Sequence, residues 1–208
     1  MGGIEAAKEE LEKRSRHGRS PRRGRGTILL VVLALVLLAL LLLPRLDEAI
    51  RRFTHPLEHE ETIRSASVEH GVEPALTAAV IRTESNFNEE VESSQGAYGL
   101  MQIRPETARF ISERSGITRD YRGPRTNIGM GTWYLNYLQN RYEGDERLVL
   151  AAYNSGEGRV DAWISEGLFD AGGDIPFEET RAYVEEVLEA RATYAELYGR
   201  NLDRSPEE

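Results

Sequence analysis

Residues 27–43 form an uninterrupted apolar run, TILLVVLALVLLALLLL, that contains no charged side chain. As a helix, with a rise of about 1.5 Å per residue, this run spans roughly 25 Å, slightly less than the hydrocarbon core of about 30 Å in a typical bilayer. Gly26 and Pro44 can lengthen it, and the flanking Arg25 and Arg45 can extend to the headgroups. A buried core helix is rarely apolar on every face. The run therefore predicts a transmembrane helix.

A cleaved signal peptide is the alternative interpretation of this run. The residues at its end, LLLPRLDEA, offer no small-x-small cleavage site directly after the apolar stretch, which favours an uncleaved signal anchor. Residues 1–26 carry eight basic side chains against four glutamates, a net charge of +4. By the positive-inside rule we expect this polar arm to be cytoplasmic and disordered, and residues 45–208 to lie on the outer side of the membrane.

The chain beyond residue 26 is acidic, with 31 carboxylates against 18 basic side chains. A domain with this charge repels phosphate backbones, so we expect no nucleic-acid partner. Long-range attraction would not drive binding of an anionic polymer either, so a glycan would be held by local hydrogen bonds and stacking. The chain has no cysteine, which excludes disulfides, thiolate metal sites and a cysteine-linked lipid anchor.

From about residue 58 the apolar residues recur at helical spacing, and no segment shows the sustained alternation typical of strands. Pro74 suits the first turn of a helix, and Asp145 is a plausible N-cap. The pattern predicts an all-α domain. The expected helices cover residues 60–70, 74–85, a segment from Pro105, 128–142, 146–154, 158–166 and 178–199.

The chain is thus expected to have five parts. They are a cytoplasmic basic arm (1–26), a transmembrane signal anchor (27–43), a linker (44–57), a folded domain (58–200) and a C-terminal tail (201–208). A fully extended linker of about a dozen residues reaches at most roughly 45 Å. The domain would therefore work close to the membrane.

Glu84 is the first candidate for chemistry. It falls in the last turn of the helix expected over 74–85, where the carbonyl end of the helix disfavours a negative charge. Val80 and Ile81 lie one turn earlier and make apolar surroundings for the carboxyl group. Both effects raise a carboxyl pKa, as a general acid near neutral pH requires. Taken alone, a glutamate late in a helix is more often simply solvated.

Three blocks of sequence change that interpretation. Residues 84–108 contain Glu84-Ser85 and then SxxGAxGLMQIxP, residues 152–160 read AYNxGxGRV, and residues 175–188 contain IP, ETRxYV and VL. Asn127-Ile128-Gly129 and Tyr134-Leu135 fit between them. In this order and spacing the chain resembles the soluble lytic transglycosylase catalytic (SLT) domain over about residues 58–200. The resemblance implies an all-α, lysozyme-like fold related to that of goose-type lysozyme.

The resemblance also implies residue roles. Glu84 falls on the catalytic acid of the family, and Tyr183 falls on the tyrosine beside it. Ser93, Gln102 and Asn154 fall on positions that line the glycan groove. The chemistry of the side chains agrees, because the amides offer both donors and acceptors to sugar hydroxyl and acetamido groups. The tyrosine can stack or donate a hydrogen bond.

Structural roles are open for several of these residues. Asn154 could end a helix, because a glycine follows two residues later. Tyr183 could simply pack on an apolar helix face, and Met101 is more typical of a core residue than of a substrate contact. Ser85 could orient Glu84 or cap a turn. Arg104 stands where the family often has an apolar residue, so this position departs from the family pattern.

The implied reaction cleaves the β-1,4 bond between N-acetylmuramic acid and N-acetylglucosamine without water. Protonated Glu84 donates to the leaving oxygen and then accepts the proton of the muramic C6 hydroxyl, which closes onto C1 as a 1,6-anhydro ring. The N-acetyl group of the substrate stabilises the cation-like centre, so a second carboxylate is not required. The expected partners are peptidoglycan strands and the membrane, with no metal or cofactor. The alternatives are a lysozyme-like hydrolase and a non-catalytic wall-binding module.

Two other groups of polar residues carry weaker signals. Glu89, Glu90 and Glu92 lie near Glu84 in the sequence, but they are interpreted as a solvated charge run and not as a second catalytic carboxylate. His55 and His59 have the i, i+4 spacing of metal ligands. A proline intervenes and no third ligand is evident, so we expect no zinc site.

Overall fold

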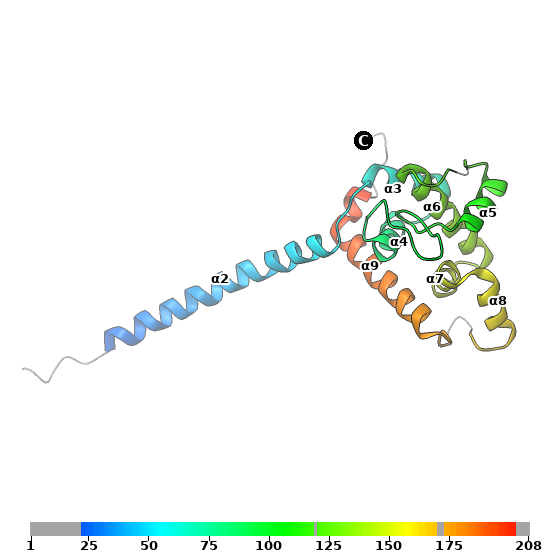
Figure 1. Ribbon diagram of the computed structural model, residues 1–208. Helices are drawn as coiled ribbons and strands as arrows, with labels where there is room; N and C mark the ends of the chain where they lie inside the picture. Colours follow the sequence, from blue (N-terminus) through cyan, green and yellow to red (C-terminus); the bar gives the residue numbers. More distant parts are fainter. Residues whose placement is uncertain (1–21, 119, 170–172, 203–208) are drawn as a thin grey trace, which may run out of the picture. The chain divides into compact units, whose positions relative to one another are not determined.

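A computed structural model describes residues 22–118, 120–169 and 173–202, all of whose regular elements are helices (Figure 1). The chain forms two compact units, Met1–Ile50 and Arg51–Glu208. The basic arm expected over residues 1–26 lies outside the described residues except for 22–26, whose backbone is helical. The tail expected over 201–208 is described only at 201 and 202, where the last helix ends.

Helix α2, Arg22–Thr54, contains the apolar run and is the first described element. Its apolar side chains are exposed on all sides, so this helix has no core of its own to cover them. By length and composition, Leu30–Thr54 is able to cross a membrane. Pro44 lies inside the helix, and the residues expected to form a linker remain helical as far as Thr54.

The described part of the second unit carries seven helices after α2, and the predicted all-α fold is confirmed. The part of the chain that is described contains no strand, only isolated bridges that pair Tyr98 with Glu92 and with Ile103. The helices are α3 (Glu60–His70), α4 (Pro74–Ser85), α5 (Pro105–Ser115), α6 (Pro124–Arg141), α7 (Glu146–Ser155), α8 (Glu157–Ser165) and α9 (Glu178–Leu202).

Local sequence signals explain where these helices begin and end. Pro74, Pro105 and Pro124 occupy first-turn positions, where the missing N–H costs nothing. The side chain of Asp145 accepts hydrogen bonds from the backbone N–H groups of the two residues at 147 and 148, as an N-cap should. Helix α6 begins four residues earlier than expected, because Pro124 can start a helix that the apolar spacing alone did not reveal.

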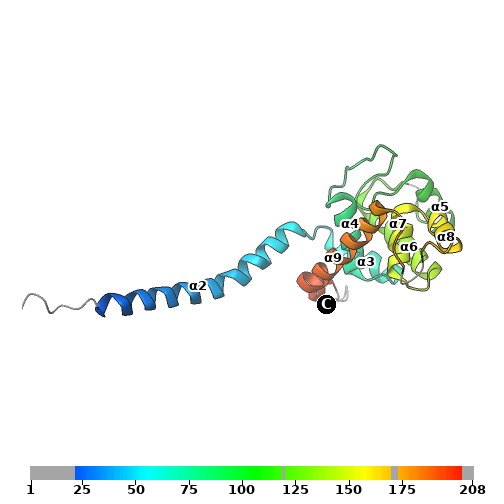
Figure 2. The ribbon, with the colours of Figure 1, turned by 90° about the horizontal axis from the view of Figure 1, so that it is seen from below.

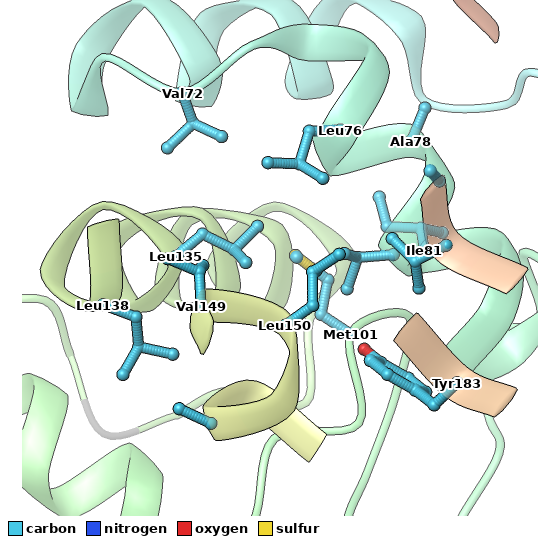
Figure 3. Close-up of a cluster of buried hydrophobic side chains, with 14 of the residues drawn as sticks. Val72, Leu76, Ala78, Ile81, Met101, Leu135, Leu138, Val149, Leu150 and Tyr183 are labelled. Carbon is cyan, nitrogen blue, oxygen red and sulfur yellow. The ribbon is translucent and has the colours of Figure 1, made fainter. Parts of the chain in front are cut away.

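Helix α4 lies inside the second unit, in contact with α3, α6 and α9. Seven consecutive residues from Ala75 to Ile81 are buried. Figures 1 and 2 both show α9 running alongside α4. In Figure 3, side chains from α4, α6, α7 and α9 meet around Met101, which comes from the loop between α4 and α5 and is fully buried. The core therefore fixes both the end of α4 and the loop that follows it.

Candidate active site

Glu84 lies one residue before the end of α4. Its residue surface is partly exposed, yet protein atoms surround the carboxyl group closely, and this burial raises the pKa of Glu84 to about 7. The hydroxyl of Tyr183 on α9 donates a 2.8 Å hydrogen bond to Glu84 Oε1, which acts on the pKa in the opposite direction. The carboxyl group is thus near half-protonation at neutral pH and has a fixed orientation.

The chain leaves α4 through two left-handed residues. Asn86 has φ 49° and Phe87 has φ 63°, although neither is glycine. Asparagine tolerates this region, whereas phenylalanine rarely adopts it. Phe87 is only 4% exposed, so its packing in the core holds the strained backbone in place. The turn leaves Glu84 at an open cavity of about 580 Å³ that is also lined by Arg82, Thr83, Ser85, Asn86, Val91 and Glu186.

Ser85 ties the end of α4 to the following loop. Its hydroxyl is placed to donate to the carbonyl of Ile81 at 3.0 Å, one turn back, and to that of Leu100 at 2.9 Å. The side chain makes no hydrogen bond to Glu84 in the described structure. Ser85 therefore holds the end of α4, next to Glu84, against the loop that contains Leu100.

Asn127 on α6 organises the loop from the other side. Its Oδ1 accepts from Met101 N at 2.7 Å, and its Nδ2 donates to the carbonyls of Tyr98 and Tyr121 at 2.8 and 2.9 Å. Asn127 is 1% exposed, so these bonds satisfy a buried amide. Gly99 lies against it with φ 80°, and a Cβ there would come within 2.7 Å of Asn127 Nδ2. This loop therefore requires glycine for both space and conformation.

In this loop, Gln102 lines a cavity, whereas the hydroxyl of Ser93 bonds to the backbone of the loop itself. Gln102 has φ 47°, and its Nε2 donates to the carbonyls of Val91 and Gly99, both at 3.0 Å. Its side-chain oxygen remains as the acceptor that the residue can offer to a ligand. Ser93 Oγ accepts from Ala97 N at 3.0 Å and stabilises the loop turn. Ser93 does not line either of the two cavities described here.

A second cavity, of about 460 Å³, brings Gln102 together with α7 residues. Tyr153 lines it and donates from its hydroxyl to the carbonyl of Met101 at 2.9 Å. Asn154 lines the same cavity, and its Oδ1 accepts a hydrogen bond from Thr180 Oγ1 at 3.0 Å. The two N–H donors of its amide therefore remain for a ligand. Asn154 is exposed at the end of α7 and does not act as the C-cap, a position held by Gly156.

Burial raises the pKa of both Tyr153 and Tyr183, and the nearby charge of Glu84 is the next largest cause. Both phenols therefore stay protonated and lie close enough to Glu84 to sense its charge. Tyr134, which lines the second cavity, packs against Tyr153 with ring centroids 5.7 Å apart and stacks on Tyr137 at 5.9 Å. The side-chain amides and aromatic rings of the second cavity are chemical groups that can bind sugar hydroxyl and acetamido groups.

The acidic residues at 89, 90 and 92 lie apart from the two cavities. Glu89 Oε1 lies 2.8 Å from His59 Nε2, Glu92 lies 3.5 Å from Arg122, and none of the residues at 89, 90 and 92 lines either cavity. Sequence reasoning missed Glu186, which lines the Glu84 cavity and pairs with Arg82 at 3.0 Å. Its position one helical turn after Tyr183 was the available signal.

Metal ligands do not gather around the site. Across residues 22–118, 120–169 and 173–202 there is no group of three or more histidine, aspartate or glutamate side chains that could hold an ion. His55 bonds to Thr54 Oγ1 through Nδ1 and packs edge-on against Tyr194. His59 faces Glu89 instead.

Sequence comparison finds relatives over most of the second unit. The family described as Transglycosylase SLT domain matches residues 61–169. The soluble lytic murein transglycosylase of Salmonella typhimurium is 38% identical over 155 residues, which cover 69% of this chain and 24% of that protein. The membrane-bound lytic murein transglycosylase C of Serratia proteamaculans is 34% identical over 161 residues, covering 64% of this chain and 45% of that protein. The chain thus spans less than half of either relative.

Solved structures have the same fold. The 70 kDa soluble lytic transglycosylase of Escherichia coli matches with a TM-score of 0.66 and 34% identity, over 72% of this chain and 26% of that one. A complex of the 70-kDa soluble lytic transglycosylase with bulgecin A matches with a TM-score of 0.66 and 33% identity, over 76% of this chain and 27% of that one. An inactive glutamate-to-glutamine variant of the lytic transglycosylase Slt of Pseudomonas aeruginosa matches with a TM-score of 0.63 and 32% identity, over 70% of this chain and 25% of that one.

Proposed function

Because the chain belongs to the Transglycosylase SLT domain family, we propose that it is a peptidoglycan lytic transglycosylase with Glu84 as its catalytic residue. One observation carries the proposal. Glu84 is a partly exposed residue whose carboxyl group is closely surrounded by protein atoms, has a pKa of about 7 and accepts a 2.8 Å hydrogen bond from the hydroxyl of Tyr183. A group that titrates near the working pH can both donate and accept a proton within one turnover.

The reaction follows from that single group. Protonated Glu84 donates to the oxygen that leaves C1 of N-acetylmuramic acid, and the C1–O bond breaks. The N-acetyl group of the same sugar stabilises the cation-like carbon, in place of an enzyme nucleophile. The carboxylate then takes the proton of the C6 hydroxyl, whose oxygen bonds to C1. The products are a 1,6-anhydro end and a free N-acetylglucosamine hydroxyl, and no water is consumed.

The residues of the second cavity are suited to hold the glycan. Gln102 offers an acceptor, and Asn154 offers donors, because their other polar atoms are already bonded within the protein. Tyr134 and Tyr153 add aromatic surface for the apolar faces of sugar rings. We assign Tyr183 to positioning of Glu84 and Ser93 to support of the loop, so Ser93 contributes to binding only indirectly.

The relatives support this proposal in two ways. The Pseudomonas protein is inactive as a glutamate-to-glutamine variant, which is consistent with one essential glutamate in the shared fold. Enzymes named lytic murein transglycosylases occur among both soluble and membrane-bound relatives. The exposed apolar helix Leu30–Thr54 supports the membrane-bound form here. The basic arm predicts that the N-terminus is cytoplasmic and that the second unit lies outside.

Hydrolysis is the second candidate function. Glu186 is a further carboxylate on the wall of the open Glu84 cavity, and a carboxylate there could hold a water molecule. The 3.0 Å ion pair with Arg82 keeps Glu186 engaged, which favours the reaction without water. The two reactions give products that differ by one water.

The proposal is tested by digestion of purified peptidoglycan with the full-length protein in detergent. The wild type should release soluble fragments, and a folded Glu84→Gln protein should release at least about a hundredfold less, since the acid and base are the same group. Glu90→Gln is the matched control, because Glu90 is exposed and lines neither cavity. Substantial cleavage by Glu84→Gln would overturn the assignment, and binding without turnover by the wild type would indicate a wall-binding module.

A further inference from the structure

Residues 51–57, here called the connecting segment, are held by the far end of α9. The hydroxyl of Tyr194 donates to the carbonyl of Pro56 at 2.7 Å, and the hydroxyl of Tyr198 donates to the carbonyl of His55 at 2.9 Å. The ring of Tyr194 also packs edge-on against His55, with centroids 5.6 Å apart. Tyr194 is fully buried. Both hydrogen bonds are partly buried, so they are screened less by solvent than fully exposed pairs are.

The connecting segment also contacts the helix that carries Glu84. Arg82, two residues before Glu84, donates from Nε to the carbonyl of Thr54 at 3.2 Å. Its Nη1 donates to Glu186 Oε1 at 3.0 Å. Arg82, Glu84 and Glu186 line the same cavity. A single guanidinium therefore joins the connecting segment to the wall of the candidate active site.

Helix α9 also contacts both the connecting segment and Glu84. Tyr183 and Tyr194 are eleven residues apart, about three turns, so they lie on one face of the helix. Tyr183 binds the carboxyl group of Glu84, and Tyr194 binds the connecting segment. Tyr194 also packs against Phe87, with ring centroids 6.3 Å apart. Phe87 is the strained residue that follows α4, so the contacts reach the chain on both sides of Glu84.

We propose that the connecting segment positions the catalytic carboxyl group, through Arg82, Tyr194 and Tyr198. The segment that joins the apolar helix to the catalytic fold is then part of the active-site support and not a passive tether. Loss of these contacts loosens residues 82–88 and moves Glu84 relative to the glycan. The catalytic consequence rests on the proposed function, whereas the structural coupling does not.

The test uses the full-length protein in detergent with the double variant Tyr194→Phe/Tyr198→Phe. This variant removes two hydroxyl groups and leaves both rings. The matched control is Tyr142→Phe, whose hydroxyl donates to the carbonyl of Glu157 at 3.2 Å and to Asp161 at 3.1 Å, away from the connecting segment. Hydrogen exchange, read by mass spectrometry, and the melting temperature are measured for all three proteins.

In the double variant, the exchange of residues 82–88 should rise at least about tenfold at temperatures far below melting, and the control should leave it unchanged. The turnover number should fall about tenfold with KM nearly constant, because small displacements of a reacting group cost rate more than binding. The alkaline limb of the pH profile should also move, since Glu84 changes its surroundings.

Equal exchange of residues 82–88 in wild type and double variant would overturn the proposal, whether or not the proteins are active. An unaltered turnover number and pH profile in an active double variant would overturn it as well. If the wild type itself cleaves no peptidoglycan, the proposed function fails, and the exchange measurement still decides the structural coupling.

Discussion

At the scale of single residues, burial and one hydrogen bond act on the carboxyl group of Glu84 in opposite directions. Burial favours the neutral acid and raises its pKa to about 7, and the hydroxyl of Tyr183 stabilises the carboxylate. The ordinary value for glutamate lies near 4.5. This rise in the pKa of Glu84 leads to two predictions, one for the pH dependence of cleavage and one for the pH dependence of stability.

The first concerns the pH dependence of cleavage. The acid must be protonated to donate, so kcat/KM of the wild type should fall above about pH 7. Tyr183→Phe removes a bond to the charged form, so the pKa of Glu84 should rise and the alkaline limb should move to higher pH. The maximal rate should fall about tenfold as orientation is lost. Rates from pH 5 to 9 test this, and a limb that moves to lower pH would contradict it.

The second concerns stability. A raised folded-state pKa means that the folded protein holds the Glu84 proton more tightly than the unfolded chain. The wild type therefore loses stability as pH rises from about 4.5 to about 7, and Glu84→Gln does not. At about 1.4 kcal/mol per pKa unit, the rise from 4.5 to about 7 should make the variant more stable by on the order of 3 kcal/mol at pH 8 and about equal to the wild type at pH 4. Urea unfolding of both proteins at pH 4 and pH 8 measures this difference in the free energy of unfolding. A difference that is the same at both pH values would contradict the prediction.

The positions of some site residues could be predicted from the sequence, and those of others could not. The pattern around Glu84 and Tyr183 singled out two residues that the structure places in contact at 2.8 Å. Gln102 and Asn154 meet at one cavity, as the pattern indicated. The hydroxyl of Ser93 is used inside its own loop, which depends on loop geometry that residue types do not encode. Glu186 carries no sequence signal apart from its spacing on α9.

At the scale of elements, the loop between α4 and α5 depends on one buried side chain of α6. Asn127 makes three hydrogen bonds to backbone groups, at Met101, Tyr98 and Tyr121. This loop carries Gln102 and contacts Tyr153, so its geometry determines the second cavity. The structural role of Asn127 could not be predicted from sequence, because its partners are backbone atoms that are distant along the chain.

Asn127→Ala should destabilise the protein by at least about 2 kcal/mol, since it leaves buried backbone groups without partners. It should also raise KM for peptidoglycan. Asn140→Ala is the control, because Asn140 is exposed on the same helix and bonds only to Asn136. The measurement is urea unfolding together with KM. Similar values for the two variants would show that the loop is held by other contacts.

Helix boundaries were largely predictable where a local rule fixes them. Proline at the first turn and the cap at Asp145 placed α4, α5 and α7. The start of α6 and the helical state of residues 44–54 were not predicted. Helix α2 continues past Pro44 through mostly polar residues, and apolar spacing does not report such a continuation.

At the scale of the whole molecule, the proposal has the second unit outside the membrane and the basic arm inside. The chain contains no cysteine, so single reporters can be introduced at Ser20 and Ser205. In spheroplasts, a membrane-impermeant maleimide should label Ser205→Cys at once and Ser20→Cys only after permeabilisation. The protein should sediment with membranes. Labelling of Ser20→Cys in intact spheroplasts would contradict the orientation, and recovery in the soluble fraction would contradict the anchor.

We propose that Glu84 cleaves the glycan without water, and the mass of the products shows whether it does. Full-length protein in detergent is incubated with purified peptidoglycan, and the released muropeptides are analysed by mass spectrometry. Cleavage without water should give 1,6-anhydro ends from the wild type and none from Glu84→Gln. Products that are heavier by one water, with reducing ends, would contradict it and would assign the same site to a hydrolase.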